Sequence, residues 1–192
     1  MIIINGETFK QVADELASIP NGTMKAINHA LNDATKGAKK QVADIVREKY
    51  AIKLAGVVKD AVSIQSPRNS GMTMEAIVII KGGGMRLRDF KHTPIKPMTG
   101  RTRKNVKVTV VKGQGGTLNS RTFKAKMKNG HIGIFQRVEG RYMRGRREAI
   151  DELFGPSVPS MAGGNKVRPE IEEFLKKKFD ERLAHYIEFL RR

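Results

Sequence analysis

The spacing of apolar residues changes twice along this chain of 192 residues, and that order limits the folds open to it. Residues such as Met24, Ile27 and Leu31 recur every three or four positions, which is helical spacing. From about residue 61 to 138 the pattern becomes alternation rich in β-branched residues, which is typical of strands. The chain then returns to helical spacing. We therefore predict an α+β fold with a mostly antiparallel β-sheet packed against two long α-helices, N-terminal and C-terminal.

The N-terminal long helix is predicted to begin with Thr23 as its cap and to run for about 26 residues, or roughly 39 Å. A short strand at residues 1–4 and a short helix capped by Thr8 precede it. Pro20 and the residues around it favour a turn. We therefore divide the chain into an extension, residues 1–20, and a main domain, residues 21–192.

The strongest local signal is a β-hairpin between residues 121 and 138. Asn129 and Gly130 form the pair preferred in a two-residue type I′ turn. In the outgoing strand apolar residues alternate with three lysines, which are expected to point outward: Lys124, Lys126 and Lys128. Lysines on an outer face commonly protect a sheet edge. Contact with phosphate groups is the alternative.

Other parts of the middle region carry weaker signals. Strands are predicted at Val62–Ser66, Thr73–Ile80 and around Val106–Val110. The glycine- and proline-containing stretches Gly82–Arg103 and Gly113–Ser120 are expected to be irregular and exposed, because loops of such length are usually functional or mobile.

The last long helix is predicted over Lys166–Arg192, with Pro169 in its first turn. Its apolar residues, including Leu175 and Leu183, form one face. Such a face must be buried on the sheet, on the first long helix or on a neighbouring subunit.

Positive charge is concentrated in the middle third of the chain. The whole chain has 37 Lys and Arg against 19 Asp and Glu, a net charge of +18. Residues 1–80 contribute 10 against 8, residues 81–147 contribute 19 against 2, and residues 148–192 contribute 8 against 9. Such a region attracts polyanions. It predicts contact with nucleic acid, docking of an acidic protein, or a solvated surface, and charge alone does not choose among them.

The composition argues against an enzyme. The absence of cysteine excludes disulfides, thiolate catalysis and zinc–thiolate sites. The four histidines are scattered, and there is no metal-binding motif, so we expect no cofactor and no metal site. A nuclease would need carboxylates near the basic region, which supplies only Asp89 and Glu139. The start of the chain does not resemble a signal peptide, and no apolar run is long enough for a bilayer, so we expect a soluble, non-secreted protein without membrane contact.

Two segments in a fixed order resemble the minor tail protein Z family of tailed bacteriophages and prophages. They are MKNGHIG with Phe135 and Arg137, and LFGPSVP from Leu153 to Pro159. The long helix around residues 25–53 and the acidic amphipathic last helix also resemble that family. The resemblance covers about residues 22–190. An added element at residues 1–20 and an arginine-rich stretch at 142–148 depart from the pattern.

The resemblance implies a structural virion protein and not an enzyme. Members of the family act in tail completion near the head–tail junction, and related completion proteins form rings around the DNA channel. The expected partners are other tail and connector proteins and further copies of the chain, with sequence-independent contact to duplex DNA as a further expectation. The expected location is the virion tail, with assembly in the host cytoplasm. The alternative is a non-sequence-specific nucleic-acid-binding module.

Two sets of residues are the candidates for these contacts. The first set consists of basic residues of the middle region that would meet a partner or DNA: Arg101, Arg103, Lys104, Lys124, Lys126, Lys128, Arg137, Arg141, Arg144, Arg146 and Arg147. The second set is a segment in which two prolines would fix a rigid extended turn for assembly contacts: Phe154, Gly155, Pro156, Ser157, Val158 and Pro159. A buried connector is the alternative role of this segment.

Overall fold

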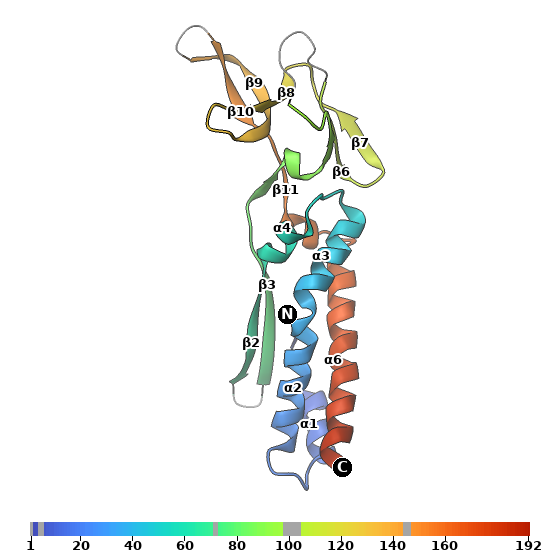
Figure 1. Ribbon diagram of the computed structural model, residues 1–192. Coiled ribbons are helices and arrows are strands. Elements are labelled where there is room, and N and C mark those ends of the chain that lie inside the picture. The colour runs from blue at the N-terminus through green and yellow to red at the C-terminus, as the bar shows by residue number, and fades with distance from the viewer. Residues whose placement is uncertain (1, 4–5, 71–72, 98–104, 144–146) are drawn as a thin grey trace. The chain divides into compact units, whose positions relative to one another are not determined.

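The chain forms two compact units in the computed structural model, which describes residues 2–3, 6–70, 73–97, 105–143 and 147–192 (Figure 1). The first unit comprises Met1–Ile45, Gly56–Lys81 and Ala162–Arg192. The second unit comprises Val46–Ala55 and Gly82–Met161.

Helices and strands alternate in blocks along the chain. The α-helices are α1 (Gly6–Glu15), α2 (Gly22–Lys36), α3 (Ala38–Lys49), α4 (Ala55–Ala61), α5 (Val158–Ala162) and α6 (Arg168–Arg191), and η1 (Leu87–Asp89) is a 3₁₀ turn. The strands are β1 (Ile2–Ile3), β2 (Val62–Ser70), β3 (Thr73–Ile80), β4 (Gly84–Arg86), β5 (Lys91–Thr93), β6 (Lys107–Val111), β7 (Gln114–Thr117), β8 (Thr122–Lys126), β9 (Ile132–Met143), β10 (Arg147–Glu152) and β11 (Phe154–Ser157).

The core of the first unit lies between α2 and α6, which run side by side (Figure 1). Ile27 and Leu31 of α2 are fully buried in one cluster with Phe179 and Leu183 of α6. The hydroxyl of Tyr186 donates a 2.7 Å hydrogen bond to Asp33 at the edge of this contact. The predicted last helix and its buried apolar face are therefore confirmed, and the face packs against α2.

The predicted N-terminal long helix is interrupted. The chain turns at Gly37, so two helices, α2 and α3, stand where one was expected. Glycine weakens a helix because it loses the most backbone freedom on folding. Thr23 is not the cap, since α2 begins at Gly22 and Asn21 precedes it with a left-handed φ of 57°.

The strands form four small antiparallel sheets, not the single sheet that the sequence predicted. Their orders are β1-β3-β2, β10-β9-β8, β11-β4 and β5-β6-β7. The mixture of helices with antiparallel strands is confirmed. The prediction of one sheet carrying both long helices is wrong, because the strands of the second unit pair within three separate small sheets.

Two stretches expected to be irregular contain strands. Within Gly82–Arg103, β4 pairs with β11 and β5 pairs with β6, and Phe90 between them is fully buried. Within Gly113–Ser120, β7 pairs with β6, although its residues are exposed as predicted. Residues 98–104 lie outside the described part of the chain.

The predicted hairpin is confirmed, with β8 and β9 paired from Thr122↔Gln136 to Lys126↔Ile132. The predicted turn type is wrong. A type I′ turn needs positive φ at both central residues, but only Gly130 of the pair has one, at 82°. Gly130 N–H donates to the Met127 carbonyl, and Met127 N–H donates to the His131 carbonyl. This pattern corresponds to a type I turn followed by a glycine bulge.

The packing of α2 on α6 yields a stability prediction. Leu31→Ala removes a fully buried side chain from this contact and should lower the free energy of unfolding by about 2–5 kcal/mol. The matched control is Lys25→Ala on the exposed face of the same helix, which should change it by less than about 0.5 kcal/mol. Urea unfolding followed by circular dichroism measures both values, and equal effects would contradict this assignment of the core.

Candidate interaction surface

The positive charge of the chain belongs almost entirely to the second unit. This unit contains 21 Lys and Arg against 6 Asp and Glu, a net charge of +15, whereas the first unit contains 16 against 13, a net charge of +3. A field of one sign over a small unit raises the local concentration of anions. The second unit is therefore the part to search for an interaction site.

Four of the predicted basic residues are exposed on the strands and turns of the second unit: Lys126, Lys128, Arg141 and Arg147. The two lysines lie at and just beyond the end of β8, next to Ile132 at the start of β9. The two arginines lie where the far end of β9 pairs with β10. An extended strand of this length separates the two pairs by roughly 35 Å. The predicted residues thus form at least two separate cationic positions.

The basic candidates differ in their surroundings. Arg137 is half-buried, and its guanidinium carbon lies 5.3 Å from the centre of the Phe123 ring. Arg141 forms a 3.0 Å ion pair with Asp151, which offsets part of its charge. Five candidates lie outside the described residues: Arg101, Arg103, Lys104, Arg144 and Arg146.

Lys124 was predicted to point into solvent, but its side chain is buried. Its neighbour Phe123 is buried as expected, yet Lys124 is also buried, at 7% exposed. Adjacent strand residues point to opposite faces, so both faces of β8 are covered here. The ammonium group donates to the Ile95 carbonyl and lies 2.7 Å from Nε2 of His92.

Buried His92 and Lys124 form a cluster with Lys53, which is exposed, and no sequence pattern predicted it. Nδ1 of His92 lies 2.8 Å from the Phe90 carbonyl, and Lys53 Nζ lies 2.9 Å from the same nitrogen. A neutral ring with its proton on Nδ1 donates to Phe90 and accepts from Lys124 at Nε2, so the Lys53 ammonium lies close to Nδ1 without donating to it. Burial lowers the pKa of His92, and the charges of Lys124 and Lys53 lower it further, against the opposing hydrogen bond to Phe90.

The same burial acts on the two lysines. Burial lowers the pKa of Lys124, and the nearby charges of Lys53 and Arg88 add to that effect. Burial also lowers the pKa of Lys53, while the Asp89 carboxylate opposes the shift. Burial therefore disfavours the protonated forms of these three side chains, and the neighbouring positive charges add to this effect at His92 and Lys124.

The far end of β9 carries exposed apolar side chains that the sequence analysis missed. Tyr142 is 65% exposed and Met143 is 62% exposed, beside Arg141 and Arg147. Exposed apolar side chains are unfavourable at the end of a strand that only meets water. Aromatic residues, Met and Arg are enriched in interfaces, so this composition favours a contact surface. The sequence prediction ended the hairpin at residue 138, whereas β9 continues to Met143. A longer predicted strand would have included both residues.

The predicted assembly segment has two structural roles. Phe154–Ser157 forms β11 and pairs with β4, so this part is extended as predicted. Phe154 is exposed, whereas Val158 is buried and begins α5. A Cβ on Gly155 would lie 2.9 Å from the buried Phe90 ring, which explains the glycine. Contact of the segment from Phe154 to Pro159 with a partner stays a prediction.

The described residues contain no cluster suited to metal catalysis. No group of three or more His, Asp or Glu side chains is placed to hold a metal ion among them. In the same part of the chain, no helix combines the length and hydrophobicity needed to cross a bilayer.

The structure is that of a basic protein built from helices and small antiparallel sheets. Comparison with known families gives a match to prophage minor tail protein Z (GPZ) over residues 10–192. The chain therefore belongs to the minor tail protein Z family, a family of structural phage tail proteins. That membership argues against catalysis and places the protein in the virion. No curated protein and no solved structure matches the chain.

The His92 cluster predicts a pH-dependent stability. Because the pKa of His92 is below its ordinary 6.5 in the folded state, the unfolded chain takes up the proton first as pH falls. The free energy of unfolding should therefore decrease as pH drops below about 6.5. His92→Gln keeps a neutral donor and acceptor, so it should flatten this slope. Unfolding curves measured at several pH values test this, and an unchanged slope in the variant would refute it.

The contact of Gly155 with Phe90 predicts the cost of adding one methyl group. Gly155→Ala should lower the free energy of unfolding by about 1–3 kcal/mol, because the new Cβ would crowd a packed ring. Gly116→Ala is the matched control, since nothing lies within 4 Å of a Cβ at that position. Thermal unfolding compares the two variants, and equal losses would contradict the packing described here.

Proposed function

We propose that this chain acts in tail completion and in joining the tail to the head, as an oligomer that surrounds or borders the DNA channel. The single observation that carries the proposal is the charge of +15 on the second unit, in a chain that belongs to a phage tail family. A structural protein with so concentrated a charge fits a position where it meets an acidic protein surface or DNA. Its partners would be other tail and connector proteins and further copies of itself, joined during assembly in the host cytoplasm.

The basic candidates would supply these contacts from two positions, the lysine pair Lys126 and Lys128 and the arginine end of β9. Phe154 and the segment that follows it would supply a contact to a neighbouring subunit. Residues 1–20 are proposed as an element added to the main domain, although Val12 and Leu16 pack in the core with α2 and α6.

The second candidate function is a non-sequence-specific nucleic-acid-binding module, which the same positive charge supports. It differs from the first in requiring tight duplex binding by the isolated chain. The described strands offer a basic surface but few exposed aromatic residues on which bases could stack. This favours contact with a duplex backbone over contact with single strands.

Deletion of the gene from its phage or prophage tests the assembly role. We expect full-length tails that carry no heads in negative-stain electron microscopy, restored by the parent gene supplied in trans. Infectious particles formed without the gene would overturn the proposal. A complete lack of tails would also overturn it, since the role would then be earlier in assembly.

A second experiment separates the DNA role from docking to a protein. It measures the affinity of the isolated chain for duplex DNA at several salt concentrations. If Lys126 and Lys128 contact phosphates, replacing both by alanine should reduce the slope of log K against log salt by about 2. The matched control replaces Lys25 and Lys40, two exposed lysines of α2 and α3, and should leave the slope unchanged. Absence of duplex binding at low salt would remove the DNA role and leave docking to an acidic protein.

A further inference from the structure

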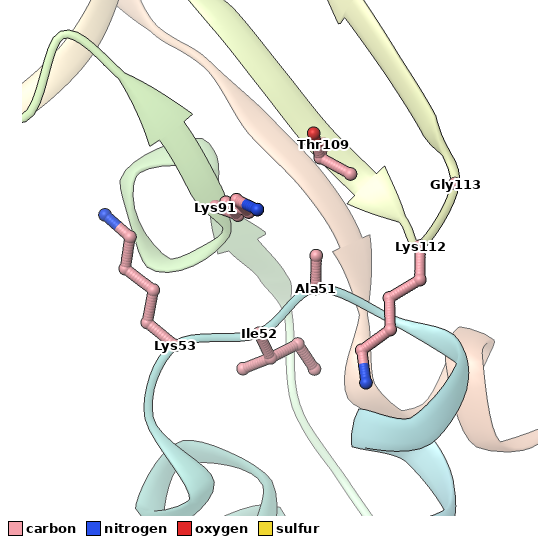
Figure 2. A pocket seen from close by; sticks show the side chains of 7 residues that line it. All are labelled: Ala51, Ile52, Lys53, Lys91, Thr109, Lys112 and Gly113. Atoms are coloured by element: carbon pink, nitrogen blue, oxygen red, sulfur yellow. The ribbon is translucent and has the colours of Figure 1, made fainter.

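A pocket in the second unit is rimmed by three lysines that the proposed contacts do not use (Figure 2). It has a volume of about 370 Å³, at the lower end of the ~300–1,000 Å³ found for ligand pockets. Its lining residues are Ala51, Ile52, Lys53, Lys91, Thr109, Lys112 and Gly113.

The backbone around the pocket is already paired, so the pocket is not a place for an added strand. The segment from Lys49 to Lys53 is held between β5 and β6. Ala51 N–H donates to the Val110 carbonyl, and Lys91 N–H donates back to the Ala51 carbonyl, both at 2.8 Å. What remains available to a ligand is the lysine side chains and the apolar surface between them.

None of the three rim lysines forms a salt bridge among the described residues, although the Asp89 carboxylate lies near enough to Lys53 to act on its pKa. The lining includes no Asp or Glu. The ion pairs among the described residues of the second unit use other cations: Lys49, Arg86, Arg88, Arg121, His131 and Arg141. Lys53 also adjoins the buried His92 and Lys124, so positive charge continues inward from the pocket.

The lining favours one kind of anion over another. The rest of the lining is largely apolar, with Ala51 and Ile52 on the segment between Lys53 and Lys112 in Figure 2 and the methylene groups of the lysines beside them. Lysine stems commonly cover apolar surface while their charged ends stay in water. A duplex backbone brings charge but little apolar surface to fill such a recess. An acidic side chain next to an aliphatic one brings both.

We propose that this pocket receives a carboxylate together with an adjoining aliphatic side chain from an acidic segment of a partner protein. The inference rests on the proposed assembly function, because it names the chemistry of one partner. The occupant we propose is a different protein, because a copy of this chain, with a net charge of +18, is a poorer source of negative charge than an acidic partner; copies can still join through other surfaces. The pocket lysines Lys53, Lys91 and Lys112 would then be binding residues beyond the two positions described above.

Nuclear magnetic resonance of the labelled full-length chain tests this proposal. The probe is a capped synthetic peptide, glycine–serine–glutamate–leucine–glutamate–glutamate–serine–glycine. We expect it to shift the amide signals of Ala51, Thr109 and Gly113 in a saturable way. Replacing its glutamates by glutamine should abolish these shifts, and replacing its leucine by serine should weaken binding at least about threefold, since an apolar group of that size contributes measurably when buried.

Two double variants locate the contact. Lys91→Ala with Lys112→Ala should weaken peptide binding at least about fivefold, through loss of two charge-assisted contacts. The matched control is Lys25→Ala with Lys40→Ala, which removes the same charge from exposed positions of the first unit, and should change binding less than about twofold because neither lysine lines the pocket. Equal weakening would show diffuse attraction and overturn the proposal.

Three other results would also overturn it, and the parent chain alone shows each of them. They are no shift with the peptide, equal binding of the glutamine peptide, and larger pocket shifts with inorganic phosphate or a 12-base-pair duplex. These results would leave the head-joining phenotype of the deletion untouched. Conversely, normal particles from the deletion phage would remove the assembly role without changing the peptide titration. Failure of the assembly role and failure of the pocket proposal are therefore distinguishable.

Discussion

The second unit depends on the complete burial of the Phe90 ring. Its backbone forms a bridge with Ile52, its carbonyl accepts from His92, and its ring fills the space beside Gly155. Three segments far apart in sequence, around Ile52, Phe90 and Gly155, therefore meet at this one residue. In a unit with a net charge of +15 and sheets of two or three strands, such an anchor matters because burial of apolar groups must oppose the repulsion of like charges.

The two units divide the work of folding and of binding. The first unit has nearly balanced charge and a continuous apolar core between α2, α6 and β3. The second unit carries the excess charge, with its acidic residues mostly taken up in local pairs such as His131 with Glu152 and Arg141 with Asp151. Exposed lysines outside those pairs remain available to partners. Membership in a phage tail family gives this surplus a use, since tail proteins function by contact with other virion components.

Much of the fold was predictable because its signals are local. The face of α6 and the β8–β9 hairpin follow from spacing and turn residues alone. The short strands β4, β5 and β11 were missed, since each gains its hydrogen bonds from a distant partner. The burial of Lys124 could not be foreseen, because alternation marks the two faces of a strand but does not show whether a second layer covers the outer one. The Lys53 pocket was missed for the same reason, since its residues come from three separate segments.

The position of Lys124 bears on how the formal charge of this protein is to be understood. A charge of +18 counts each basic letter as if it stood in water. An amine enclosed beside a second amine and an imidazole cannot reach an approaching molecule, and its proton is held less firmly than that of an ordinary lysine. Direct contacts with partners should thus draw on fewer basic side chains than the composition implies. For a small cationic protein, where each charge sits matters as much as how many there are.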